Sequence, residues 1–114
     1  MLKTNFITHN DDDLINISGT HGQGTISANY IDLVDTFGEP LEGDNYKTDA
    51  EWIVSFTVGD SQTVIATIYN WKNGKNYCGR DGDDVLDIRE WNVGGHDPIC
   101  VALVEQAMKE VTEC

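Results

Sequence analysis

The segment EWIVSFTVG, residues 51–59, constrains the fold more than any other part of the chain. Hydrophobic side chains fall on every second position, which is typical of a strand with one buried face; they are Trp52, Val54, Phe56 and Val58. The segment TVIATIYNWK, residues 63–72, is rich in β-branched and aromatic residues and follows after the short sequence GDSQ. The two segments therefore predict an antiparallel hairpin with one apolar face.

Another segment, ANYIDLVDTFGEP (residues 28–40), carries the apolar stripe of an amphipathic helix. Its hydrophobic side chains recur at helical spacing, namely Tyr30, Leu33, Val34 and Phe37. Asn29 is placed to cap the first turn, whereas Gly38 and Pro40 are placed to end the helix. We therefore predict a helix between these signals.

DPICVALVEQAMKEV, residues 97–111, predicts a second helix. Asp97 suits the N-cap, and Pro98 suits the first helical position because its missing N–H loses no hydrogen bond there. Hydrophobic residues again form a stripe, made of Val101, Val104, Met108 and Val111. Cys100 lies beside this stripe, so we expect it in the core rather than as a reactive thiol.

Shorter segments complete the expected architecture. TIS (25–27) predicts a short strand after the glycine-rich sequence GTHGQG (19–24), which we expect to be a loop. VLDIREWNV (85–93) predicts a third meander strand, at an edge or with a bulge, because charged residues interrupt its apolar face. The prediction is an α+β fold, with an antiparallel sheet of three to four strands and two helices packed on one face. Residues 1–114 form one domain, in which 1–13 are irregular or frayed.

The charge balance bears on which partners the chain can bind. Twenty acidic residues stand against seven Lys and Arg among 114 residues, for a formal net charge of −13. Direct binding to nucleic acid is not expected, because it requires clustered Lys and Arg to neutralise phosphates. A basic protein surface is a better match, since a negative field speeds encounter with it. The acidity could also serve solubility alone.

Other features of the composition indicate the cellular setting. No run of about 18 apolar residues is present, so we expect no membrane-spanning segment. The three cysteines lack CxxC spacing, which argues against a disulfide framework or a zinc site and favours reduced thiols in a cytosol.

The sequence EWNVGGHDPIC, residues 90–100, allows two interpretations. Backbone N–H groups at Gly94 and Gly95, with His96 beside them, could bind an anion at a helix N-terminus. Asp97 would however place a carboxylate at the same point. We favour the alternative in which the two glycines supply positive φ for a tight strand-to-helix turn. Neither a GxGxxG nor a GK[ST] motif is present.

No set of residues predicts catalysis or metal binding. The three histidines are scattered, and DGDD (81–84) lacks the ligand spacing of a calcium loop. Asp11, Asp12 and Asp13 near His9 match a solvated charge run better than a cation site. No GxSxG motif occurs, and no nucleophile, base and orienting group can be assembled. We therefore expect a protein with no catalytic residues, metal or cofactor.

Carboxylates are concentrated in two expected loops. One group is Glu39, Glu42, Asp44, Asp49 and Glu51, and the other includes Asp81, Asp83, Asp84 and Asp87. If both loops lie at one edge of the sheet, they form an anionic ridge that could bind a basic partner. Trp71 and Trp91 fall at strand ends, where partial exposure would suit an interface. The alternative is that all three tryptophans belong to the core.

A resemblance adds to these expectations. The run YIDLVDTFGEPLEGD, followed by AEWIVSF, TVIATIYNWK and EWNVGGHD, resembles a family of small, mostly uncharacterised bacteriophage proteins. In that family a helix ending in FGEP precedes a Trp-bearing strand, an ATIY-W strand and a W-x-x-GGH turn. The resemblance covers residues 24–104 and implies a phage origin, and hence the host cytoplasm, but no particular activity.

Three functions are consistent with these features. The first is a stoichiometric inhibitor of a host nucleic-acid-handling defence protein, of the anti-CRISPR or anti-restriction type, which binds a basic surface, with DNA mimicry as one mode of binding. The second is a sponge that sequesters a nucleotide immune signal, with Gly94, Gly95 and His96 contacting its phosphates. The third is a phage accessory or structural protein.

Overall fold

The computed structural model describes residues 5–9, 20–41, 48–59 and 62–112, which form five strands and three α-helices. In chain order the elements are β1 (Asn5–Thr8), β2 (His21–Ser27), α1 (Tyr30–Phe37), β3 (Glu51–Val58), β4 (Gln62–Tyr69), α2 (Lys75–Cys78), 3-10 turns at Gly79–Asp81 and Val85–Asp87, β5 (Glu90–Gly95) and α3 (Ile99–Thr112). The α+β class is therefore confirmed, with more strands than expected and one additional short helix.

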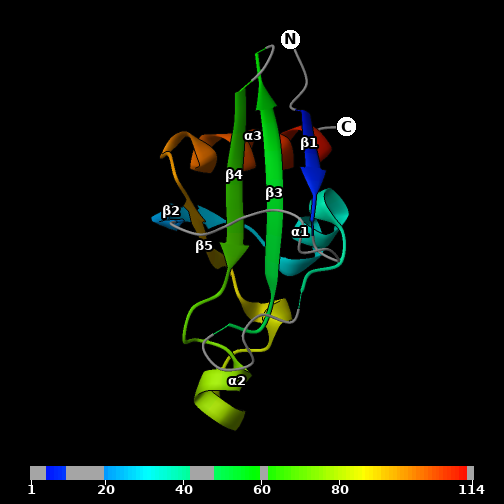
Figure 1. Ribbon diagram of the computed structural model, residues 1–114. Coiled ribbons are helices and arrows are strands. Elements are labelled where there is room, and N and C mark those ends of the chain that lie inside the picture. Colours follow the sequence, from blue (N-terminus) through cyan, green and yellow to red (C-terminus); the bar gives the residue numbers. More distant parts are fainter. Residues whose placement is uncertain (1–4, 10–19, 42–47, 60–61, 113–114) are drawn as a thin grey trace.

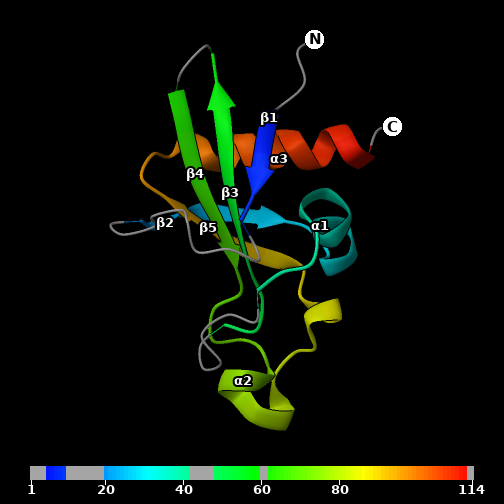
Figure 2. The same ribbon diagram turned by 45° about the vertical axis from the view of Figure 1, so that its right-hand side comes forward.

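All five strands form one antiparallel sheet with the order β1-β3-β4-β5-β2. The long helices α1 and α3 cover one face of this sheet, and the short helix α2 lies beyond the end of the β3–β4 hairpin (Figure 1). Seen from the side, α3 runs across the back of the hairpin, and β5 and β2 turn away from the direction of β3 and β4 (Figure 2). Among the described residues, no helix lies over the opposite face of the sheet.

The β3–β4 hairpin supplies the core, as its alternation predicts. Trp52, Val54 and Phe56 pair with Ile68, Ala66 and Val64, and all six side chains are buried under the helices. Helices contribute Leu33 and Phe37 from α1, and Cys100, Val104, Ala107 and Met108 from α3. Burying one hydrophobic side chain stabilises the fold by about 1.5–3 kcal/mol, so this shared layer holds the hairpin to both helices.

The expected ends of α1 are confirmed. The side-chain oxygen of Asn29 accepts a hydrogen bond from the backbone N–H of Asp32 at 2.8 Å. Gly38 follows the last turn with a φ of 86°, and its N–H donates to the carbonyl of Val34. The carbonyl of Gly38 in turn accepts the indole N–H of Trp52 at 2.7 Å, which fixes the end of the helix to β3.

Two segments expected to be irregular are strands. Asn5–Thr8 forms β1, which pairs with β3 and places the Phe6 ring against Phe37 and Phe56 at centroid distances of 5.2 and 5.7 Å. Residues 21–24 belong to β2 rather than to a loop, and a register shift separates Gly22 from Gly24. In β2, pairing with β5 overrides the low strand propensity of glycine and polar residues, whereas three of the four residues of β1 themselves favour a strand.

The third meander strand also differs from its prediction. Residues 85–87 form a 3-10 turn, and β5 begins at Glu90 and continues to Gly95. β5 lies between β4 and β2, so it is not an edge strand. The charged residues Asp87 and Arg89 did not fit the alternation expected for residues 85–93. The structure explains this, because both residues precede the strand.

The glycine pair of the GGHDP sequence has a different role from the one expected. In the described residues the glycines with positive φ are Gly38, Gly59 and Gly79, and neither Gly94 nor Gly95 is among them. Both are strand residues, and a Cβ at Gly95 would lie 2.6 Å from the carbonyl oxygen of Ile65 and 2.9 Å from Cys100 Sγ. Close packing, rather than a left-handed turn, therefore requires glycine here.

The start of α3 follows the sequence prediction. The carboxylate of Asp97 accepts a hydrogen bond from the N–H of Ile99 at 3.0 Å. Cys100 is fully buried, and burial together with the nearby charge of Asp97 raises the pKa of its thiol. No described helix has the length and apolar character needed to cross a bilayer.

Candidate functional site

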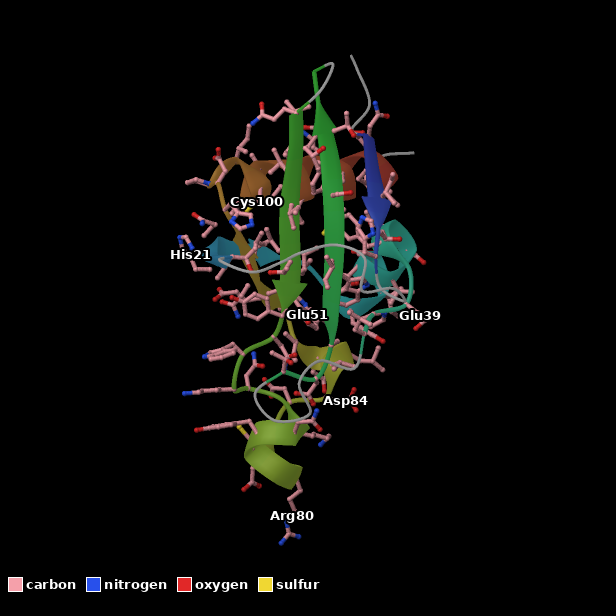
Figure 3. The ribbon with its side chains drawn as sticks, viewed as in Figure 1. His21, Glu39, Glu51, Arg80, Asp84 and Cys100 are labelled. Carbon is pink, nitrogen blue, oxygen red and sulfur yellow. The ribbon has the colours of Figure 1, made fainter. Side chains whose placement is uncertain are left out.

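A pocket of about 220 Å³ lies on the face of the sheet opposite α1 and α3. We call it the open-face pocket, and its described lining consists of Thr20, His21, Thr48, Glu51, Thr67, Tyr69, Trp71 and Gly94. The pleat explains the position, because Glu51 and Tyr69 are paired and point away from their buried neighbours Trp52 and Ile68. Figure 3 labels two contributors, His21 from β2 and Glu51 from the start of β3.

Aromatic side chains form one wall of the pocket. The rings of Tyr69 and Trp71 meet edge to face with their centroids 6.1 Å apart, and 46% of Trp71 is exposed. The ammonium of Lys72 lies 5.8 Å from the Trp71 ring centroid and 5.5 Å from that of Tyr77, which is 41% exposed. The wall therefore presents the half-exposed Trp71 indole with the Lys72 ammonium beside it, and Tyr77 lies outside the pocket lining.

The other walls are polar and include a carboxylate. Glu51, His21 and three threonine hydroxyls line them, and the described lining contains no Lys or Arg. Burial, followed by the negative charge of Glu51, raises the pKa of the Tyr69 hydroxyl. Gln23 donates to the carbonyl of Gly95 at 2.9 Å, and its amide nitrogen lies 3.2 Å from His21 Nε2. The surroundings of the pocket are therefore mixed in charge, with the Glu51 carboxylate in the lining and the Lys72 ammonium beside Trp71.

Gly94 forms part of the pocket floor. A Cβ at this position would lie 2.8 Å from Thr67 Oγ1 and 3.4 Å from Tyr69 Cε1. A side chain here would therefore displace two lining residues and fill the pocket.

A buried asparagine holds the site together. Asn70 is fully buried, and its carbonyl oxygen accepts hydrogen bonds from the N–H groups of Asp49 and Ala50 at 2.7 and 3.2 Å. Its amide donates to the carboxylate of Asp49 at 3.0 Å and to the side-chain oxygen of Asn73 at 3.1 Å. We call this arrangement the Asn70 clamp.

The clamp joins two segments that are distant in sequence. Asp49 also accepts from the N–H of Asn76 at 3.2 Å, and the Asn76 amide donates to the carbonyl of Thr48 at 3.1 Å. The segment leading into β3 is therefore fixed against residues 70–89, which we call the turn lobe. The described contacts therefore join residues 48–50 to residues 70–76, while residues 42–47 of the first acid-bearing loop lie outside the described residues.

Three of the predicted residues come together in the open-face pocket: Glu51, Trp71 and Gly94. Asp49 is engaged in the clamp, and Asp84 accepts the N–H of Leu86 at 3.1 Å. The other predicted carboxylates that the structure describes are exposed; they are Glu39 after α1 and Asp81, Asp83 and Asp87 in the turn lobe. Glu42 and Asp44 lie outside the described residues, as do Asp11, Asp12, Asp13 and Cys114.

Trp91 is not available to a partner, contrary to the expectation of partial exposure. It is fully buried and packs edge to face against Trp52 at a centroid distance of 5.4 Å. Its position opposite Ile26 in the β2–β5 pairing places it on the helix-covered face. Trp91 Nε1 has no hydrogen-bond partner among the described residues.

Gly94, Gly95 and His96 do not form one ligand site. Gly94 reaches the open-face pocket, whereas Gly95 faces Cys100 in the core. His96 is exposed before α3, beside Asp97 and residues 62–65. The alternation of a strand separates the two glycines because successive residues point to opposite faces.

The charge of the turn lobe differs from a uniform anionic ridge. The turn lobe, residues 70–89, contains four acidic and four basic residues, so it has no formal net charge. In the other described segments, Lys109 is the one Lys or Arg, and the acidic residues are Asp32, Asp35, Glu39, Asp49, Glu51, Glu90, Asp97, Glu105 and Glu110. The negative field therefore arises mainly from outside the lobe.

Sequence reasoning missed most of the pocket lining. Thr67 and Tyr69 alternate with the core residues Ala66 and Ile68 of β4, and this parity placed them on the opposite face without showing that Thr67 is buried there. Thr20, His21 and Thr48 reach the pocket through strand pairing and the Asn70 clamp, for which the sequence carries no local signal. Among the described residues, no three His, Cys, Asp or Glu side chains group as they would around a metal ion.

Comparisons with protein-family models, curated proteins and solved structures find no match to this chain.

Proposed function

We propose that the chain is a non-enzymatic inhibitor that binds the basic surface of a host nucleic-acid-handling defence protein. The observation that carries this proposal is the meeting of accessible aromatic rings and carboxylates at one end of the sheet. Trp71 and Tyr77 are both more than two-fifths exposed, and Glu51, Asp81 and Asp83 belong to the segments joined by the clamp. Large exposed aromatics commonly anchor protein interfaces.

Charge supports a basic partner. A net charge of −13 attracts a cationic surface over a distance of about one Debye length and raises the rate of encounter. Proteins that grip nucleic acid present such surfaces. The resemblance to phage proteins favours a host defence protein as the target.

The mixed charge of the turn lobe favours an ordinary protein–protein contact over mimicry of a DNA strand. A mimic needs regularly repeated negative charge, and the four basic residues of residues 71–91 interrupt any such series. Inhibition would then follow from occupying the basic surface, with aromatic anchors at the centre of the contact and carboxylates around it.

The first experiment is capture of the partner from infected cells with the tagged chain, followed by a competition assay with nucleic acid. We expect a basic protein whose nucleic-acid binding is blocked at equimolar inhibitor. Trp71→Ala should weaken the complex by at least about 2 kcal/mol, mainly through faster dissociation. Val111→Ala, which truncates an exposed side chain on α3, is the matched control and should have no effect.

Ionic strength provides the second test. Association should slow by at least tenfold between low and high salt, because the attraction is between exposed charges. Association that is insensitive to salt, or a complex that tolerates Trp71→Ala, would refute the proposed mode of binding.

The nucleotide sponge has less support from the geometry. Gly94, Gly95 and His96 face three different surroundings, and no Lys or Arg lines the described part of the pocket. A sponge would show a large thermal shift with a cyclic or ADP-ribose-type nucleotide, whereas the proposed inhibitor should show none. An accessory or structural protein would instead be found in purified virions.

A further inference from the structure

We propose that the outer edge of β2 binds an extended basic segment of the partner, which adds to the sheet as a further antiparallel strand. This inference rests on the proposed function, because it names the part of the basic partner that this surface receives. It also predicts a binding that can be measured on the isolated chain with short peptides.

β2 is an edge strand whose outer hydrogen-bonding groups are unpaired in the described part of the chain. It ends the strand order and pairs with β5 alone among the described strands. The N–H of Ala28 donates to a β5 carbonyl at 2.9 Å, and Ile26 has the same parity in the register. Alternate residues of an antiparallel ladder turn their N–H and C=O groups to opposite sides. Thr25 and Ser27 therefore direct these groups away from β5.

The edge also lacks the features that commonly keep edge strands from pairing with another chain. Lys or Pro residues and bulges are the usual devices. β2 contains no Lys, Arg or Pro, and its register shift lies near its start, between Gly22 and Gly24. From Gly24 to Ser27 the register is regular, and both Thr25 and Ser27 are exposed. This stretch is therefore open to a further strand.

A groove lies beside the edge on the helix-covered face, and we call it the β2 groove. It has a volume of about 310 Å³, and its lining includes Ile26, Met108, Asp32, Glu105 and Lys109. β2 runs beside α3 and leads into α1, so the groove lies where these three elements meet (Figure 2). A strand added at the edge would send alternate side chains toward this groove.

The groove favours a basic side chain at the position opposite Ile26. A residue at that position points to the same face as Ile26 does. Its aliphatic stem can lie against Met108 while its charged end reaches Asp32 or Glu105. Among the described residues, no hydrogen bond or ion pair engages either carboxylate group. The two carboxylates also outnumber the one ammonium in the lining, that of Lys109.

Charge selects against a second copy of this chain as the occupant of the edge. Each copy has a formal net charge of −13, so edge-to-edge pairing would bring two acidic chains together. A basic segment is attracted by the same field. The occupant that fits both the edge and the groove is therefore an extended segment with basic residues at alternate positions.

The test uses the whole chain, labelled with ¹⁵N, and a capped peptide of alternating lysine and threonine as the probe. With its lysines toward the groove, an antiparallel peptide turns its threonine N–H groups toward Thr25 and Ser27. We expect a dissociation constant on the order of 1 mM, with the largest NMR shifts at the amides of these two residues.

Backbone methylation of the peptide separates strand pairing from attraction by charge alone. A peptide methylated on its threonine nitrogens keeps every charge but loses the donors to the edge, and it should bind about tenfold more weakly. The matched control is methylated on its lysine nitrogens, which point away from β2, and it should bind like the unmodified peptide.

Variants localise the effect. Thr25→Pro removes an outward N–H without removing a hydrogen bond to β5, and it should abolish the shifts. The double variant Asp32→Asn/Glu105→Gln should weaken binding about threefold. Its matched control is Asp35→Asn/Glu39→Gln, which removes two exposed carboxylates outside the groove and should leave binding unchanged. The two methylated peptides on the unaltered chain remain decisive if Thr25→Pro does not fold.

Four results would overturn the inference. They are equal binding of the two methylated peptides, shifts centred on another part of the chain, unchanged binding by Asp32→Asn/Glu105→Gln, and a dimer in sedimentation that Thr25→Pro dissociates. The dimer would show that a second copy occupies the edge.

The two proposals fail separately. If the peptides do not bind at β2 but the partner still binds in a salt-dependent manner through Trp71, the edge site is wrong and the proposed function stands. If the peptide binds at Thr25 and Ser27 but no basic partner is captured from infected cells, the edge site stands and the proposed function is wrong.

Discussion

Replacing Asn70 with aspartate would reverse the sign of one contact in the clamp without changing its shape. The carbonyl oxygen that receives the N–H groups of Asp49 and Ala50 is kept in the variant. The amide that donates to the Asp49 carboxylate at 3.0 Å becomes a carboxylate oxygen. Asn70→Asp therefore places two negative charges in direct contact at a fully buried position.

The magnitude follows from this distance. Two unit charges 3 Å apart repel by about 5 kcal/mol at an effective dielectric constant of about 20, and loss of the hydrogen bonds adds about 1 kcal/mol. Relaxation and solvent around the half-buried Asp49 reduce the repulsion, so we expect a loss of about 3 kcal/mol in the free energy of unfolding near neutral pH. For a chain of this length that corresponds to a decrease in Tm of roughly 10 °C.

The pH dependence separates repulsion from simple loss of contacts. The introduced carboxyl holds its proton more tightly in the folded than in the unfolded chain, because burial and a neighbouring carboxylate both disfavour its charge. The destabilisation is therefore complete above the folded-state pKa of position 70 and declines as the pH falls through that value. Asn70→Ala, which loses the hydrogen bonds without adding charge, should not recover at low pH relative to the unaltered chain.

Urea unfolding followed by circular dichroism, at several pH values between about 4 and 8, measures these differences. The ¹⁵N spectrum should also show altered signals at Trp71 and Gly94, since the clamp positions the pocket. If Asn70→Asp loses less than about 1 kcal/mol at neutral pH, or shows the same pH profile as Asn70→Ala, the clamp does not have the role assigned to it.

Three further results are expected. Gly95→Ala should destabilise the fold by about 2 kcal/mol because its Cβ would overlap a backbone carbonyl. Gly24→Ala on β2 is the comparison: its Cβ meets a side-chain methyl at 3.2 Å, so we expect a change in stability of less than about 1 kcal/mol. Equal effects of the two variants in urea unfolding would contradict the packing argument. Trp52→Phe should be about 1 kcal/mol more destabilising than Trp91→Phe, because the Trp52 indole N–H donates to a carbonyl and the Trp91 indole N–H has no acceptor among the described residues. A larger loss of stability for Trp91→Phe in urea unfolding would argue against this difference. Cys100 should resist iodoacetamide at pH 8 until urea unfolds the chain, because burial both shields its thiol and raises its pKa; rapid modification in the native protein, mapped by mass spectrometry, would be inconsistent with its place in the core.

Local signals in the sequence determined the elements whose residues interact with near neighbours. The alternation of residues 51–59 and 63–72, the stripe of α1 with its Asn29 cap, and the Asp97 start of α3 all depend on contacts within a few residues. The α+β class followed, because an apolar sheet face and two apolar stripes can be buried together in this way. Charge patterning likewise identified Glu51 as a binding candidate, and the position of Trp71 at a strand end identified that residue as another.

Long-range pairing decided the rest. The glycine-rich part of β2 forms a strand because β5 supplies its hydrogen-bond partners, which no local propensity reveals, and β1 is placed at the edge of the sheet by its pairing with β3. Trp91 is buried because its pairing with β2 turns it toward Trp52, and the two glycines are separated by the pleat of β5. The open-face pocket exists only after these pairings and the Asn70 clamp bring four separate segments together, so a sequence read one segment at a time could name some of its residues but not the site.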